Sequence, residues 1–154
     1  MSTRRASRSS RQANGVTTPR IDAHLEHIRS QFRRVDVEGA EQAAAAGGLL
    51  VDTRPIELRR RDGEIPGALV IDRNVLEWRL DPSSPHRHPA LGRGDVDRVV
   101  VVFCDEGYAS SLAAASLRNI GMNGATDLIG GFQAWRTAGR PVTRVGPDAP
   151  ATGG

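Results

Sequence analysis

The stretch Arg98-Val-Val-Val-Val-Phe103, followed by Cys104-Asp-Glu-Gly-Tyr-Ala-Ser110, decides how this chain folds. Its first part is the most apolar run of the sequence, which predicts a buried strand over residues 98–103. The second part is a short loop with glycine at position 107, and the residues beyond it, 109–120, predict a helix. The sole cysteine therefore stands between the carboxyl end of a strand and the amino end of a helix.

This position favours a reactive thiolate at Cys104. The first amides of a helix have no partner within the helix, and the helix dipole adds partial positive charge, so an anion is stabilised there. In such settings a cysteine pKa falls from ~8.5 into the range of roughly 3.5 to 7.5. Gly107 permits backbone conformations closed to other residues, which lets the amides of residues 108–111 surround one centre. The alternative is a small apolar side chain that fills space at the end of a strand.

Short apolar strands alternate with helical segments along the rest of the chain. Further strands are predicted over 49–51, 68–71 and 126–129, and helices over 21–32, 38–46, 55–61, 74–80, 109–120 and 132–137. Such alternation predicts an α/β domain with a parallel sheet.

The chain of 154 residues is long enough for one domain with a continuous core. We predict a disordered basic tail over 1–20, a single domain over 21–145 with an amino-terminal helix (21–34) and a core (35–142), and a loose tail over 146–154. All 21 basic residues are arginines. Five lie in the first tail without an acid, whereas 21–145 holds 16 arginines and 17 acids. Positive charge therefore belongs to the tail, and nucleic acid is not an expected partner.

Composition also bears on location. One cysteine excludes an internal disulfide, and the sequence has no apolar run near the ~18 residues of a membrane span. The basic amino terminus lacks the apolar segment of a secretory signal. We therefore expect a cytoplasmic protein without a membrane partner.

Five motifs in order resemble those of the rhodanese-like domain family. They are a strand before Asp52-Thr-Arg54, Gly63-Glu-Ile-Pro-Gly-Ala68, Cys104-x-x-Gly107-x-x-Ser110 between a strand and a helix, Leu128-Ile-Gly-Gly-Phe-x-x-Trp135, and Gly139-x-Pro141. The resemblance covers roughly residues 35–142. It implies a central parallel sheet of about five strands with helices on both faces. It also implies a single-domain sulfurtransferase of the thiosulfate sulfurtransferase type, with Cys104 as the catalytic nucleophile.

The chemistry of such a site is sulfur transfer through a persulfide. A thiolate attacks the outer sulfur of thiosulfate, a persulfide or a polysulfide, and the terminal sulfur then stays on the cysteine until cyanide or a thiol removes it. Helix-end amides stabilise both anions, so we expect neither a metal nor another cofactor. Because the chain has no second cysteine, the acceptor is a separate molecule, either a small thiol or cyanide or a protein sulfur acceptor.

The loop departs from the usual family pattern because it carries two acids, and alanine where an arginine is common. The expected substrate-binding residues of the loop are Asp105, Glu106, Gly107, Tyr108, Ala109 and Ser110. Its two carboxylates oppose the approach of a dianion such as thiosulfate. Arg73 and Arg79, just beyond a strand end, are the candidates to offset this charge.

Other interpretations remain open. Ser110 stands where rhodanese-type phosphatases and arsenate reductases carry an oxyanion-clamping arginine, which argues against phosphoryl transfer. The main alternative to an enzyme is a rhodanese-like binding or regulatory module without turnover, which the acidic loop would suit. Asp52 and Arg54 are expected to give structural support as a hydrogen-bonded pair. His86 and His88 lack a third ligand, so we interpret them as a solvated loop rather than a metal site.

Overall fold

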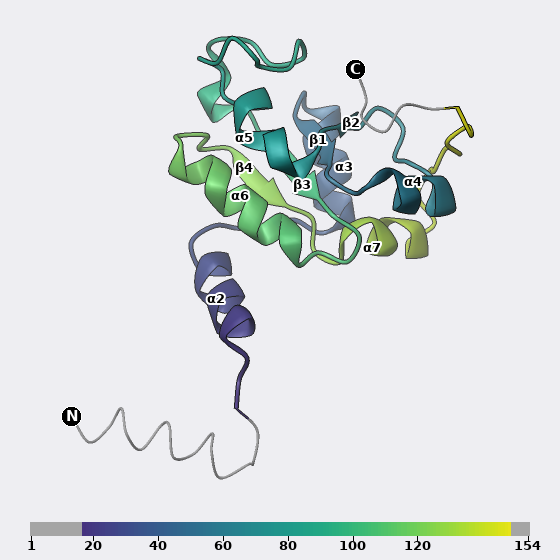
Figure 1. The fold of residues 1–154 in the computed structure, drawn as a ribbon, viewed down its shortest axis with the longest axis horizontal. Coiled ribbons are helices and arrows are strands. Elements are labelled where there is room, and N and C mark those ends of the chain that lie inside the picture. Colours follow the sequence, from purple (N-terminus) through teal and green to yellow (C-terminus); the bar gives the residue numbers. More distant parts are fainter. Residues whose placement is uncertain (1–16, 149–154) are drawn as a thin grey trace, which may run out of the picture.

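Four parallel strands form the sheet at the centre of the protein (Figure 1). In this computed structural model, which describes residues 17–148, they are β1 (Leu49–Asp52), β2 (Leu69–Val70), β3 (Val100–Phe103) and β4 (Ala125–Asp127). The order across the sheet is β2-β1-β3-β4, so β3 is an inner strand and all carboxyl ends lie at one edge. Parallel sheets of α/β proteins bind ligands at this edge.

The predicted parallel α/β fold is confirmed, and the expected number of about five strands is close to the observed four. Val35 adds an isolated parallel bridge to Leu128 beyond β4, which extends the sheet by one position. Most of the two predicted tails, residues 1–16 and 149–154, lies outside the described residues.

The described part of the chain contains six α-helices. They are α2 (Arg20–Arg29), α3 (Val37–Ala45), α4 (Ile56–Asp62), α5 (Leu76–Arg79), α6 (Ala109–Asn119) and α7 (Gly131–Thr137), with short 3-10 turns at Arg73–Val75 and Asp95–Asp97. None of them has both the length and the apolar character that a membrane crossing needs.

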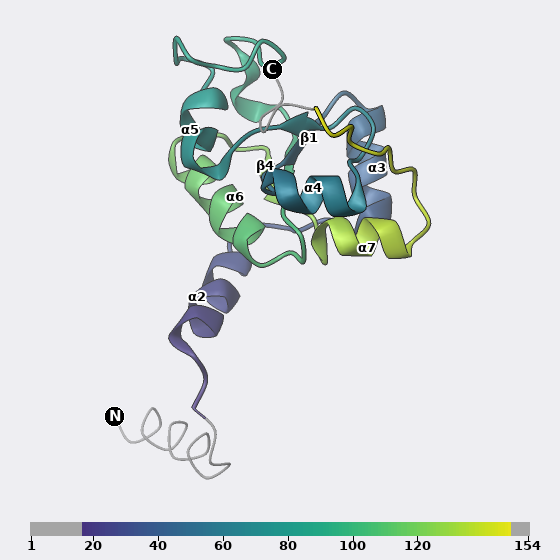
Figure 2. The same cartoon turned by 45° about the vertical axis from the view of Figure 1, so that its right-hand side comes forward.

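Helices cover both faces of the sheet, as Figures 1 and 2 show. Alternate side chains of β3 point to opposite faces because the side-chain period of a strand is two. Val102 packs with Leu117 of α6 on one face, whereas Val101 packs with Ala40 of α3 and Phe132 of α7 on the other. All four residues of β3 are fully buried, so two apolar clusters hold this strand in place.

The amino-terminal helix is shorter than predicted. The periodicity predicts a helix over 21–32, but α2 ends at Arg29, with Ser30 as its C-cap. The chain then turns so that the Val35 amide can donate to the Asp127 carbonyl over 3.1 Å, which joins it to the sheet. Leu25 and Ile28 are the buried residues of α2, which packs against α6 and otherwise projects from the domain (Figures 1 and 2).

Candidate active site

Cys104 directly follows the last residue of β3, and it is half-buried. The Gly107 amide donates a hydrogen bond to the Cys104 Sγ atom over 3.2 Å. At the start of α7, the amides of Phe132 and Gln133 donate to the carbonyl oxygens of Cys104 and Asp105 over 2.9 and 3.0 Å. The sulfur therefore lies at the carboxyl edge of the sheet, in a loop that backbone hydrogen bonds hold between β3 and α6.

Two glycines allow α7 to come close to this loop. Gly107 has a φ of +89°, and a Cβ atom there would lie 2.7 Å from the Gly130 nitrogen. Gly131 has a φ of +60°, and its Cβ would lie 2.6 Å from the Cys104 carbonyl oxygen. Real side chains do not tolerate such contacts or these backbone angles, so both positions require glycine.

A buried carboxylate at the end of β4 supports the loop and the start of α6. Asp127 has no exposed surface, and it accepts hydrogen bonds from the hydroxyls of Ser110 (2.8 Å) and Ser111 (2.9 Å). Arg34 donates to both of its oxygens, from Nε over 2.8 Å and from Nη2 over 3.0 Å. A buried charge needs such full pairing. Asp127 thus ties the first turn of α6 to the end of β4.

Two arginines from the amino-terminal region reach the loop itself. The Nη2 atoms of Arg29 and Arg34 donate to the Gly107 carbonyl over 2.7 and 3.0 Å. Arg29 Nε also donates to the Ser111 hydroxyl over 2.9 Å, and its guanidinium lies 5.8 Å from the centre of the Tyr108 ring. Positive charge therefore meets the loop from α2 and from the segment that follows it.

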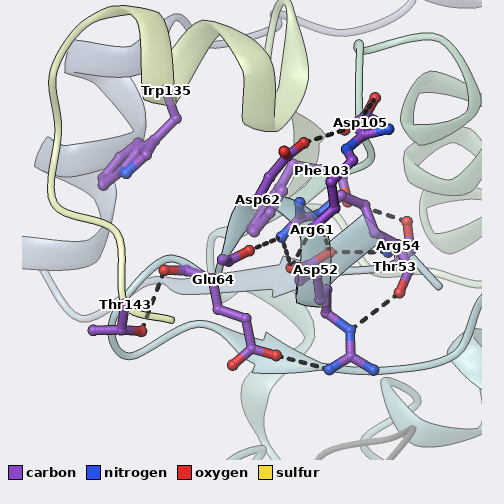
Figure 3. Close-up of polar contacts among 12 residues, drawn as sticks. Asp52, Thr53, Arg54, Arg61, Asp62, Glu64, Phe103, Asp105, Trp135 and Thr143 are labelled. Carbon is purple, nitrogen blue, oxygen red and sulfur yellow. Dashed lines mark hydrogen bonds and ion pairs between the residues drawn. The ribbon is translucent and has the colours of Figure 1, made fainter. Parts of the chain in front are cut away.

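The two loop acids have different surroundings. Gln133 Nε2 donates to Asp105 Oδ1 and to Asp62 Oδ2, both over 2.9 Å. Arg61 Nη2 lies 3.8 Å from Asp105 Oδ2, and Figure 3 shows Arg61, Asp62 and Asp105 together. The hydrogen bond from Arg61 lowers the pKa of Asp62 to about 2, and the hydrogen bond from Gln133 acts in the same direction. Glu106, in contrast, is exposed to solvent. Asp105 is thus held in an ion-pair network, whereas the charge of Glu106 faces water.

The predicted Asp52–Arg54 pair is present and buried (Figure 3). Arg54 donates from Nε over 3.1 Å and from Nη2 over 2.9 Å to the two Asp52 oxygens, and from Nη2 to the Gly63 carbonyl over 2.7 Å. The guanidinium carbon lies 3.7 Å from the centre of the Phe132 ring. Burial raises the pKa of Asp52, and the hydrogen bonds from Arg54 act against this increase. Its predicted supporting role agrees with these contacts and stays a prediction.

Arg73 and Arg79 have other partners than the loop. Arg73 Nη1 donates to both Glu77 oxygens over 2.9 and 3.0 Å, and Arg79 Nη1 donates to the His86 carbonyl over 3.1 Å. Within residues 17–148, neither has a hydrogen bond or an ion pair to residues 104–110. Arg73 does line an open hollow of about 320 Å³ at the carboxyl ends of β1 and β2. Their part in substrate binding stays a prediction without support from a direct contact.

Sequence reasoning missed four residues around the loop, namely Arg29, Arg34, Asp127 and Gln133. Only Asp127 carried a local signal, since it is an acid within the apolar stretch predicted as the strand 126–129. The contacts of the two arginines span 73 to 93 residues of sequence, and no local pattern marks such pairs. Among the described residues there is no group of three or more His, Cys, Asp or Glu side chains that could hold a metal ion.

Comparison with known proteins places this geometry in a family. The family model described as "Rhodanese-like domain" matches residues 36–138. The chain is 31% identical over 109 residues to "Thiosulfate sulfurtransferase GlpE" of Pseudomonas fluorescens, which covers 70% of this chain and 88% of that protein. The corresponding protein of Stutzerimonas stutzeri is 30% identical over 107 residues, or 70% of this chain and 87% of its own length.

Solved structures agree with this placement. A protein of Rhodopseudomonas palustris, described as of unknown function and a "Possible Tyrosine Phosphatase", has a TM-score of 0.71 at 32% identity, covering 83% of this chain and 97% of its own. The human single-domain sulfurtransferase TSTD1 has a TM-score of 0.57 at 25% identity, covering 69% of this chain and 96% of its own. Because the family model matches two thirds of the chain, and the first of these relatives is 31% identical along most of its length, the chain belongs to the rhodanese-like domain family.

Proposed function

We propose that this protein is a single-domain sulfurtransferase that carries sulfane sulfur on Cys104. The observation that carries the proposal is the 3.2 Å hydrogen bond from the Gly107 amide to the Cys104 sulfur, in the loop between β3 and α6. An amide that donates to the sulfur favours its anionic form over the thiol, and the thiolate is the nucleophile in sulfur chemistry. Relatives named thiosulfate sulfurtransferase support the same activity.

The reaction has two balanced steps. The Cys104 thiolate attacks the outer sulfur of thiosulfate, the sulfur–sulfur bond of the donor breaks, and sulfite leaves with the electron pair. Cys104 then carries a persulfide, whose terminal sulfur holds the negative charge one bond beyond the Cys104 sulfur. Cyanide or a thiolate attacks the terminal sulfur, and the cysteine thiolate is the leaving group. Persulfides and polysulfides donate to Cys104 in the same way.

The loop charges bear on the choice of donor. Gln133 and Arg61 lie against Asp105, so the repulsion from this carboxylate is partly offset, whereas Glu106 remains an exposed negative charge. We propose that thiosulfate is accepted at a moderate rate and that donors of lower charge are accepted better. The acceptor is a small thiol, cyanide or a protein, in a reducing compartment that we propose to be the cytoplasm.

Phosphoryl transfer is a less suitable function for this site, although one structural neighbour is described as a possible tyrosine phosphatase. Phosphate-transferring enzymes with a cysteine nucleophile need a cation that clamps the equatorial oxygens. Ser110 occupies the corresponding position, is fully buried and donates its hydroxyl to Asp127. It therefore supplies neither charge nor a free donor to a bound phosphate. A module without turnover remains the second candidate because Glu106 places an acid at the mouth of the loop.

A thiosulfate:cyanide assay tests the proposal. The wild-type protein should form thiocyanate, and Cys104→Ser should form none while it keeps its far-UV circular dichroism. Hydrolysis of p-nitrophenyl phosphate by the wild-type protein, lost in Cys104→Ser, would instead establish the phosphatase. A folded wild-type protein that forms thiocyanate from no donor, including polysulfide, would support the module.

A further inference from the structure

We infer that Arg29 and Arg34 are positioning residues, which hold the Gly107 carbonyl on the outside of the cysteine loop and so keep the loop amides and positive charge directed at Cys104. The inference rests on the proposed function only for the reaction that it serves. The geometry itself is a property of the folded protein.

Gly107 is held by both of its peptide groups. Its amide donates to the Cys104 sulfur over 3.2 Å, while its carbonyl accepts from Arg29 over 2.7 Å and from Arg34 over 3.0 Å. Charge-assisted hydrogen bonds of this kind are about twice as strong as neutral ones. Gly107 adopts a positive φ of 89°. Among the described residues, its carbonyl accepts no hydrogen bond other than those from the two arginines, so they alone keep it turned outward.

The orientation of this one peptide unit matters for an anion. A trans peptide is planar, so its C=O and the following N–H point in opposite directions. When the two arginines hold the Gly107 carbonyl, the N–H of Tyr108 points in the opposite direction, away from the arginines. If the peptide flipped, a carbonyl dipole would replace an amide there, and it would repel a thiolate or persulfide.

Arg29 and Arg34 also place positive charge beside the negatively charged loop. Residues 104–110 contain two acids and no base, so the loop by itself repels anionic donors. The positive charge of Arg34 is largely neutralised by Asp127, because its Nε and Nη2 atoms donate to both Asp127 oxygens. Arg29 forms no ion pair with a carboxylate among the described residues, so less of its charge is neutralised by a direct partner than that of Arg34.

Neither arginine belongs to the part of the chain that the family model matches. The match begins at residue 36, whereas these residues lie at the end of α2 and in the segment before Val35. The family fold therefore supplies the loop, and the region before residue 36 supplies the groups that hold it. This makes the α2 region part of the reactive site rather than an appendage.

The experiment compares three variants by the pH profile of Cys104 alkylation with iodoacetamide, without any sulfur donor. The charged groups of the loop and of the elements packed against it are Asp105, Glu106, Asp127, Arg29, Arg34, Arg61 and Asp62. Arg29→Gln removes one of them, Arg29→Lys keeps the charge but loses the two-point contact, and Arg33→Gln is the matched control. Arg33 is exposed, so its substitution by glutamine changes the net charge by the same amount without removing a contact to the loop.

Arg29→Gln should move the alkylation profile to higher pH and slow alkylation at pH 7 by about threefold, with Arg29→Lys in between and Arg33→Gln unchanged. With thiosulfate, Arg29→Gln should lower kcat/KM by roughly tenfold, mainly through KM. Ser111→Ala, which removes only the Nε partner of Arg29, should have a smaller effect in the same direction.

An alkylation profile of Arg29→Gln that coincides with that of Arg33→Gln would overturn the inference. Loss of sulfur transfer in the wild-type protein would overturn the proposed function instead, because the alkylation profile decides the positioning role without it. Arg34→Lys tests the other arginine: it keeps a charge for Asp127 but loses the contact to the Gly107 carbonyl, so it should slow alkylation, and an unchanged rate would remove Arg34 from the inference.

Discussion

Two buried aspartates stand on either side of the strand that leads to Cys104, and they serve different purposes. Asp52 ends β1 and Asp127 ends β4, and both have no exposed surface and an arginine partner. The partner of Asp52 is Arg54, only two residues away. The partners of Asp127 are Arg34 and two serines of α6, which lie between 16 and 93 residues away from it in the sequence.

The difference separates residues that support the fold near the site from residues that also affect the reactivity of Cys104. Arg54 donates to Asp52 and to the Gly63 carbonyl, so we expect this pair to support the connection between β1 and β2. Asp127 joins β4, α6 and Arg34, and Arg34 continues to the Gly107 carbonyl. A change at Asp52 should therefore cost stability alone, whereas a change at Asp127 should also reach the sulfur.

The largest effect is expected for Asp52→Ala. This variant leaves the Arg54 guanidinium buried without its counter-charge, which should lower the free energy of unfolding by about 3 to 5 kcal/mol. Urea denaturation measures the loss. The alkylation rate of Cys104 in the remaining folded protein should match the wild type, and a slower rate under native conditions would show that Asp52 also affects the reactivity of the sulfur.

Asp127→Asn should cost less stability but change reactivity. The amide keeps the shape and one acceptor oxygen, so we expect a loss of about 2 kcal/mol, together with a slower gain of sulfur from thiosulfate. Urea denaturation gives the change in the free energy of unfolding, and intact-mass spectra of samples quenched at successive times give the rate of sulfur gain. If the variant gained sulfur at the wild-type rate once the rate is corrected for the folded fraction, Asp127 would serve the stability of the fold alone, as we expect of Asp52.

Glu106→Arg reverses the one loop charge that is exposed to solvent. The exposed acid opposes a dianion, so an arginine there should raise kcat/KM for thiosulfate by about fivefold, with little change in melting temperature. Glu106→Gln is the charge-only control and should give a smaller gain. A fall in kcat/KM with intact folding would show that this carboxylate assists the reaction.

The smallest effect is expected at Asp62 of α4, which accepts a hydrogen bond from the same Gln133 amide that donates to Asp105. Its pKa in the folded state, about 2, lies below its ordinary value of 3.8 because Arg61 donates a hydrogen bond to it. The unfolded chain therefore binds more protons between these values, and the stabilisation is present above pH 4 and lost as the pH falls toward 2. Since Arg61 is largely exposed, solvent screening limits the gain to about 1 kcal/mol.

Denaturation of Asp62→Asn at several pH values tests this point. The variant should be less stable than the wild type at pH 7, and the difference should shrink steadily below pH 4. A difference that stays constant down to pH 2 would mean that the carboxylate charge contributes nothing.

What the sequence could predict follows the same division. The strand before Cys104, the alternation of strands and helices and the Asp52–Arg54 pair all depend on neighbours within a few residues, and the sequence shows them. The loop contacts of Arg29 and Arg34 depend on how α2 packs on α6, which no local pattern encodes. The sequence therefore predicted the fold and the position of the cysteine, but not what holds its loop.

The two arginines that the sequence suggested illustrate the limit. Arg73 lies beyond a strand end, as expected, but Glu77 stands four residues later and takes its charge. This i,i+4 spacing was visible in the sequence and predicts such a pair on a helix. For Asp105, in contrast, nothing local indicated that Gln133 and Arg61 would lie against it.

The most direct test of the account is the intact mass of the protein after exposure to thiosulfate and, separately, to a polysulfide, before and after cyanide. We expect the wild-type protein to gain one sulfur, roughly 32 Da, that cyanide removes and that Cys104→Ser never shows. A folded wild-type protein with a free thiol that gains no mass from either donor would contradict it.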